Sequence, residues 1–66
     1  MSDDSRALVA RSDLPEHEAL RLLAAASGHA RSSLLAGARV TDDERDAFRT
    51  LERRRLEGEP LQYIEG

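Results

Sequence analysis

Residues 13–28 read DLPEHEALRLLAAASG and carry the most regular apolar pattern of the chain. Four of their positions recur at i, i+3, i+4 and i+7, a spacing that places side chains on one face of an α-helix. Such a face is stable only when it packs against another surface, so the pattern predicts an amphipathic helix at the centre of the fold. The expected buried stripe consists of Ala19, Leu22, Leu23 and Ala26.

The two ends of this helix also carry recognisable signals. Asp13, followed by Glu16 three positions later, is typical of a capping box at a helix start. Pro15 is compatible with a first turn, because the N–H that it lacks would have no helical partner. Gly28 can adopt the left-handed conformation that commonly ends a helix.

A second long helix is predicted between residues 41 and 58. Thr41 and Glu44 form a capping-box pattern, and residues 42–43 add two acids to the first turn. Residues 53–55 are three arginines in the last turn, so the charges at both ends complement the helix dipole. Gly58 is expected to end the helix. The expected inward residues are Ala47, Phe48, Leu51 and Leu56.

Two shorter helical segments complete the pattern, roughly over residues 3–12 and 30–36. Leu34 and Leu35 are the expected core contribution of the second of these. β-Branched and aromatic residues are scarce, which disfavours strands, whereas Ala, Leu, Arg and Glu favour helix. We therefore predict an all-α fold, a small bundle of four main short helices, with a possible fifth helical turn at the C-terminus.

Length and composition limit the protein to one small domain. The chain has 66 residues, and ten of its apolar residues are alanine, so its core is small and its stability marginal. It contains no cysteine, which excludes disulfides and thiolate metal sites, and no apolar run long enough to span a membrane. The acidic start, MSDD, differs from a signal or transit peptide, so a cytoplasmic protein is expected.

The sequence offers no pattern typical of a catalytic, cofactor or metal site. His17 and His29 are twelve positions apart, which does not match a helical metal-binding pair, and both are expected at the surface. The carboxylates cluster at helix starts, where capping explains them. The glycines are isolated, whereas phosphate-binding loops need several close together. No catalytic, cofactor-binding or metal-ligating residue is therefore assigned.

A helix-turn-helix DNA reader is one alternative, with the segment around residues 31–33 as its recognition helix. That segment, Arg-Ser-Ser, lacks the Asn, Gln or Lys side chains that read base edges. The net charge of −3 also differs from the positive field of nucleic-acid binders. We therefore expect no direct contact with nucleic acid.

The arginines of residues 53–55 have two interpretations. They are either a solvated helix end or a site where a guanidinium binds a carboxylate or phosphate of a partner. Glu57 and Glu59 lie close enough to compete for them. We favour a structural joint, in which Gly58 turns the chain, Pro60 fixes its exit, and Glu59 pairs with one of the neighbouring arginines.

The last thirteen residues, RRLEGEPLQYIEG, resemble a motif near the start of the peptide chain release factor glutamine methyltransferases, the HemK family. The helical pattern before them is similar to that family as well, although it is less specific. The family often has a polar residue at the position of Leu20, so Leu20 is expected to contribute less to the core than Leu22. The residues assigned to the motif and joint are Arg54, Arg55, Gly58, Glu59, Pro60, Gln62, Tyr63 and Gly66.

The resemblance implies that the chain is the N-terminal domain of a longer enzyme. Residues 1–58 would form the helical bundle, and residues 59–66 would begin the linker toward a β-hairpin and a methyltransferase domain. That catalytic domain would bind S-adenosylmethionine and methylate the glutamine of the Gly-Gly-Gln loop in bacterial release factors. The family's catalytic residues match no position here, so this chain alone is expected to hold no cofactor.

The partners implied by the resemblance are bacterial release factors and the chain's own catalytic domain. The protein is expected to be a monomer and to have no contact with a membrane. The resemblance implies that the bundle helps to bind the release factor and to orient it toward the catalytic domain, as a substrate-recognition domain. A free-standing helical adapter or regulator is the remaining alternative, beside the less favoured DNA reader.

Overall fold

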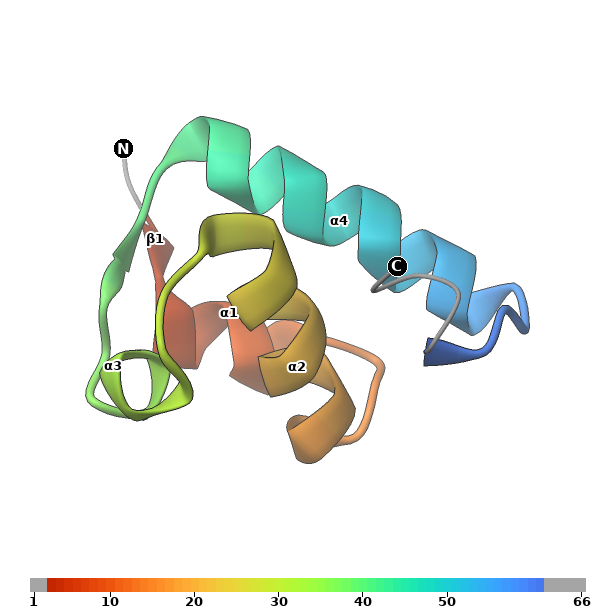
Figure 1. Cartoon of the computed structure of the whole chain (residues 1–66), viewed down its shortest axis with the longest axis horizontal. Coiled ribbons are helices and arrows are strands. Elements are labelled where there is room, and N and C mark those ends of the chain that lie inside the picture. Colours follow the sequence, from red (N-terminus) through yellow and green to blue (C-terminus); the bar gives the residue numbers. More distant parts are fainter. Residues whose placement is uncertain (1–2, 62–66) are drawn as a thin grey trace.

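Four helices, joined by short connections, make up most of the fold in a computed structural model that describes residues 3–61 (Figure 1). This confirms the all-α class and the four-helix bundle. The possible fifth turn lies beyond Leu61 and therefore outside the described residues. The helices are α1 (Ser5–Arg11), α2 (Glu16–Ser27), α3 (Arg31–Leu35) and α4 (Asp42–Leu56), and two short strands are β1 (Asp3–Asp4) and β2 (Arg39–Val40).

The start of α4 has the capping box that the sequence predicts. The Thr41 hydroxyl accepts a hydrogen bond from the Glu44 N–H at 3.2 Å, and the Glu44 carboxylate accepts one from the Thr41 N–H at 3.0 Å. The capping box predicted for α2 is wrong. Pro15 occupies the N-cap position and no side chain caps the helix, because Asp13 lies two residues too far upstream to reach the first free N–H groups.

The core forms where α2 meets α4, with α1 and α3 closing its other sides. Figure 1 shows α4 running along one edge of the molecule, with α2 next to it and α3 at the end nearest the strands. Phe48 is the largest buried side chain within residues 3–61, and it packs with the predicted α2 stripe. The buried apolar residues are Leu8, Ala19, Leu20, Leu22, Leu23, Leu34, Val40 and Phe48.

Two predictions about leucines are wrong. Leu20 is only 3% exposed and belongs to the core, although it was expected to contribute little. Leu35 is 50% exposed, although it was expected inside. Successive helix residues are about 100° apart, so within the short α3 only Leu34 can face the core.

The inner face of α4 also differs from the prediction, because part of it is polar. Ala47 is exposed and Leu56 is 51% exposed, whereas Glu52 is buried together with Phe48. Positions 48, 52 and 55 share one face by helical spacing, and apolar periodicity alone cannot indicate a face that includes Glu and Arg.

Both oxygens of the buried Glu52 carboxylate accept hydrogen bonds. The Ser12 hydroxyl donates to one of its oxygens at 2.6 Å, and Arg49 donates to the other at 3.2 Å. The Ser12 hydroxyl also accepts from the Leu14 N–H at 3.1 Å. A carboxylate held in this way links α4 to the connection between α1 and α2, and it avoids the cost of an unpaired buried charge.

The two strands form a two-residue antiparallel ladder that pairs Asp3 with Val40 and Asp4 with Arg39. This ladder could not be predicted from strand propensity, because tertiary packing brings the two segments together. The Val40 side chain enters the core, and the buried Ser5 hydroxyl donates to the Leu34 carbonyl at 2.7 Å. These contacts hold the end of α3 and the strand that follows it against the start of α1.

Gly37→Ala is expected to destabilise the fold more than Gly28→Ala. Both glycines have a positive φ, so alanine costs about 1–2 kcal/mol at either position. A Cβ at Gly37 would also lie 3.1 Å from an oxygen of Asp4, whose carboxylate caps α1 by accepting from the Arg6 N–H. A Cβ at Gly28 meets nothing within 4 Å. Thermal unfolding of the two variants measures the difference, and equal midpoints would contradict a role for the Asp4 contact.

Candidate functional site

The end of α4 turns through a Schellman motif, a backbone arrangement that satisfies the last carbonyls of a helix. Gly58 has φ of 103°, and its N–H donates to the Arg55 carbonyl at 3.0 Å. The Glu59 N–H donates to the Arg54 carbonyl at 3.1 Å. This pair of bonds defines the motif and requires the left-handed residue that glycine supplies. The exit of the chain from α4 is therefore fixed by the backbone.

An ion pair adds to this turn. The Nε and Nη2 atoms of Arg54 lie 2.9 and 2.8 Å from the same oxygen of Glu59. The geometry places the charges of two motif residues side by side, as the sequence suggested. Both side chains remain more than a third exposed, at 41% and 44%, so solvent screens the pair and its contribution to stability is small.

Arg55 makes the more buried contacts of the corner. Its Nε donates to the carboxylate of Glu18 in the first turn of α2, and its Nη1 donates to the Glu59 carbonyl at 3.2 Å. The two charged side chains are 31% and 14% exposed. One guanidinium thus joins α4, α2 and the chain that leaves the bundle, and it does so where both helix dipoles favour these charges.

The structure therefore brings together five of the assigned motif residues at one corner, which we call the α4 corner. The role of this corner as a joint stays a prediction. Leu61 packs partly against the core, and a hollow of about 440 Å³ lies beside it, lined in part by Arg55 and Pro60. The corner residues are Arg54, Arg55, Gly58, Glu59 and Pro60; Gln62, Tyr63 and Gly66 lie outside the described residues.

Neither histidine belongs to a metal-binding cluster within residues 3–61, where no three His, Asp or Glu side chains converge. His29 lies 3.9 Å from Glu44 and is partly exposed, whereas His17 is exposed on α2. In the same part of the chain, no helix has both the length and the apolar character needed to cross a bilayer.

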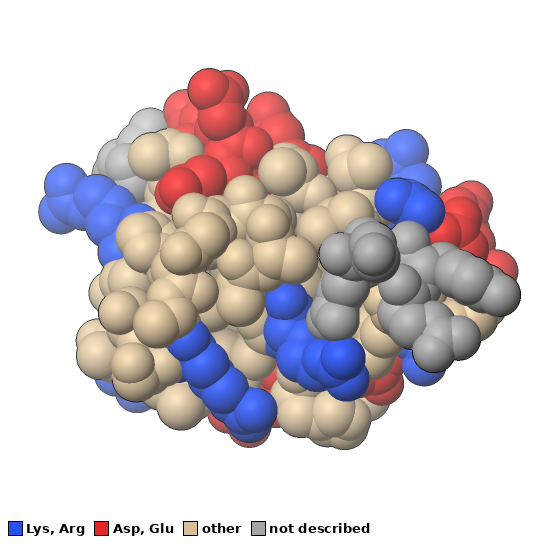
Figure 2. Space-filling model, viewed as in Figure 1, with Lys and Arg blue, Asp and Glu red and all other residues tan. Residues whose placement is uncertain are grey.

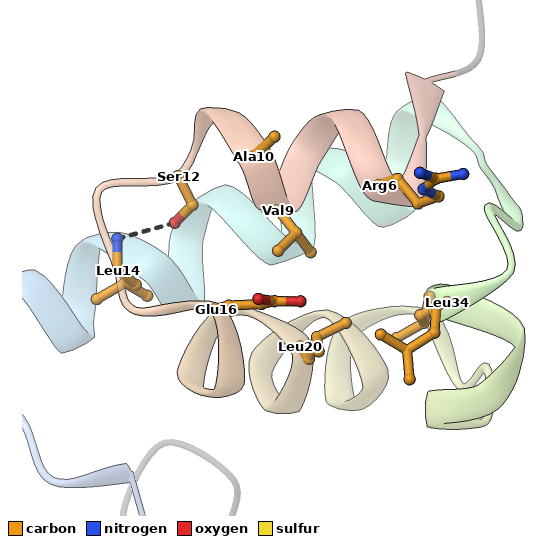
Figure 3. Close-up of a pocket in the computed structure, with 9 residues that line it drawn as sticks. Arg6, Val9, Ala10, Ser12, Leu14, Glu16, Leu20 and Leu34 are labelled. Carbon is orange, nitrogen blue, oxygen red and sulfur yellow. Dashed lines mark hydrogen bonds between the residues drawn. The ribbon is translucent and has the colours of Figure 1, made fainter.

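A groove between α1, α2 and α3 was not predicted from the sequence. It has a volume of about 580 Å³, and Figure 3 shows Val9 of α1 and Leu20 of α2 facing each other across it. Leu35 also lines the groove, so its exposed side chain forms part of the groove wall. The sequence contains one indication of this groove. Leu34 and Leu35 are neighbours in a helix, and only one of two neighbouring helix residues can face the core, so the other lies at the surface.

Acidic and basic side chains are distributed differently on the surface. On the face shown in Figure 2, acids gather along the edge where α4 begins, and arginines lie in separate groups. The first turn of α4 supplies three of these acids, residues 42–44. Among the residues that the structure describes, this face therefore shows no continuous basic stripe of the kind that binds a nucleic-acid backbone.

Comparison with models of protein families gives a match over most of the chain. A family model described as the PrmC N-terminal domain covers residues 4–66, which includes all four helices and the α4 corner. No curated protein and no solved structure matches the chain significantly. Because the family match extends over nearly the whole length, this chain belongs to the PrmC N-terminal domain family.

Proposed function

We propose that the chain is the substrate-recognition and orientation domain of a protein-glutamine methyltransferase. The protein substrate is a bacterial peptide chain release factor, methylated at the glutamine of its Gly-Gly-Gln loop with S-adenosylmethionine as methyl donor. Membership of the PrmC N-terminal domain family carries this proposal. The domain would act in the cytoplasm as a monomer, beside its own catalytic domain.

The described residues lack the features with which doubly wound folds bind S-adenosylmethionine. Doubly wound nucleotide sites use a glycine-rich loop between a strand and a helix, with an acidic residue further along to hold the ribose. Here β1 and β2 are two residues each, and Gly28, Gly37 and Gly58 stand singly at turns. The proposal therefore leaves cofactor binding and methyl transfer to the catalytic domain, and gives this chain a binding role.

The geometry gives less support to the DNA reader. Its recognition helix would be α3, which has only five residues, Arg31–Leu35. A major-groove helix needs several side chains on one face, and α3 already turns Leu34 into the core. A free-standing adapter would fold in the same way, so only binding can distinguish it from the proposed function.

Titration of the isolated chain with an intact bacterial release factor tests the proposal. We expect saturable binding by calorimetry, with no heat from S-adenosylmethionine under the same conditions and none from duplex DNA at physiological salt. An elongation factor of similar size and charge is the control protein. The adapter interpretation gains support if the release factor and the control behave alike, and saturable cofactor binding would contradict the division of roles.

A further inference from the structure

The groove between α1, α2 and α3 has an apolar floor with charges at its two ends. Leu20 and Leu34 form the floor and are closed to water, at 3% and 0% exposed, while Val9 and Leu35 line the sides. Leu35 is 50% exposed, one of only two large apolar side chains in residues 3–61 that reach this level of exposure. A half-exposed leucine beside a depression is the arrangement expected where another apolar surface packs.

Two opposite charges border the groove without a partner in the described part of the chain. The Glu16 carboxylate extends over the groove from the first turn of α2, and Arg6 lies toward its other end on α1 (Figure 3). Within residues 3–61, neither side chain makes a hydrogen bond or an ion pair; only the Arg6 backbone N–H is bonded, to Asp4. The α2 dipole accounts for an acid at Glu16 but leaves the carboxylate available.

The backbone around the groove favours a helical occupant. The walls are helices whose N–H and C=O groups are bonded internally, so an extended segment would find no strand edge there and would place unpaired backbone groups over leucines. A helix carries its own backbone bonds. The groove follows α1, and the stretch from Arg6 to Ser12 is about 9 Å long at 1.5 Å per residue. That length matches about two turns of a docked helix.

We propose that this groove receives an amphipathic helix of the partner protein. Its apolar residues at i, i+3 or i+4 and i+7 would pack on Val9 and Leu35, an acidic residue at one end would pair with Arg6, and a basic residue about two turns away would pair with Glu16. The inference rests on the proposed function only for the identity of the protein that carries this helix.

The test is a nuclear magnetic resonance titration of the ¹⁵N-labelled chain with an intact bacterial release factor. We expect amide shifts to concentrate around the groove, at Val9, Ala10 and Leu35, and to be small at Thr50 on the outer side of α4. Leu35→Asp and Glu16→Arg should each raise the dissociation constant by about tenfold or more, because each alters a side chain at the proposed contact.

Matched variants separate the groove from general effects. Leu56→Asp and Glu57→Arg make the same substitutions at equally exposed residues that do not line the groove, and we expect both to bind like the original chain. Circular dichroism of each variant identifies any that fails to fold. Shifts that map elsewhere, or equal weakening by the control variants, would overturn the groove assignment and leave the proposed function standing.

Two further outcomes are informative. Groove amides that shift with the concentration of the chain alone would mean that a second copy occupies the groove, which overturns the inference. No binding of the release factor at millimolar concentration would instead overturn the proposed function itself, and the partner helix with it.

Discussion

Leu22→Ala is expected to lower the free energy of unfolding by about 2–5 kcal/mol. Leu22 has no exposed surface and lies in the stripe of α2 that faces α4. Alanine there loses apolar contact and leaves a cavity that the surrounding helices can fill only in part. A domain of this length has a free energy of unfolding of only several kcal/mol. A loss of about 5 kcal/mol should therefore leave the variant largely unfolded.

Thermal and urea unfolding, followed by circular dichroism, measure this effect. The melting temperature should fall by about 10 °C or more, since 1 kcal/mol corresponds to about 4–8 °C in a domain of this size. Leu56→Ala is the matched control, because it removes the same atoms from a half-exposed leucine, and it should change stability little. Leu20→Ala should resemble Leu22→Ala. If all three variants melted alike, the core described here would be wrong.

The sequence predicted the features that depend on local chemistry. The Thr41 capping box, the stripe from Ala19 to Leu23 and the left-handed turn at Gly58 each follow from residues close together in the chain. Asp13 does not cap α2 because it lies two residues before the N-cap position, although its spacing to Glu16 matches a capping box. Pro15, with its fixed φ, takes the cap position there instead.

The features that the sequence did not predict depend on tertiary packing. The buried Glu52 carboxylate accepts a hydrogen bond from Ser12, forty residues earlier, and no local pattern contains that pairing. Leu20 is buried because α1 and α3 cover a second side of α2. The groove lies where α1, α2 and α3 meet, and this meeting is a property of the packed bundle. The α4 corner, by contrast, could be predicted from the sequence, because its residues are close together in the chain.

The second large effect is expected at the α4 corner, in a full-length enzyme that carries this domain. Arg55→Ala removes the contact to Glu18 and the bond to the Glu59 carbonyl, so it loosens both the helix pair and the chain leaving it. If this corner sets the angle between the bundle and the catalytic domain, the bound protein substrate shifts with it. A displacement of about 1 Å can cost about 100-fold in rate, so turnover on an intact release factor should fall by about 10–100-fold.

Glu59→Ala should have a smaller effect than Arg55→Ala. It removes only the solvent-screened pair with Arg54, and the two backbone bonds of the Schellman motif remain. Arg53→Ala is the matched control on the same helix, because Arg53 is exposed and has no hydrogen bond or ion pair within residues 3–61. Arg53→Ala should leave turnover unchanged. A loss of turnover equal to that of Arg55→Ala would mean that the effect arises from the overall charge of the chain.

The comparison of two substrates separates orientation from chemistry. Under the proposed function, a short Gly-Gly-Gln peptide is expected to reach the catalytic domain without using the bundle, so a joint that positions the intact factor should not influence its methylation. Arg55→Ala is therefore expected to slow transfer to the intact factor while transfer to the peptide and affinity for S-adenosylmethionine stay the same. Equal losses on both substrates would mean that the corner supports the catalytic domain itself. Unchanged turnover on both would mean that the angle is fixed elsewhere, and either result would end the joint hypothesis.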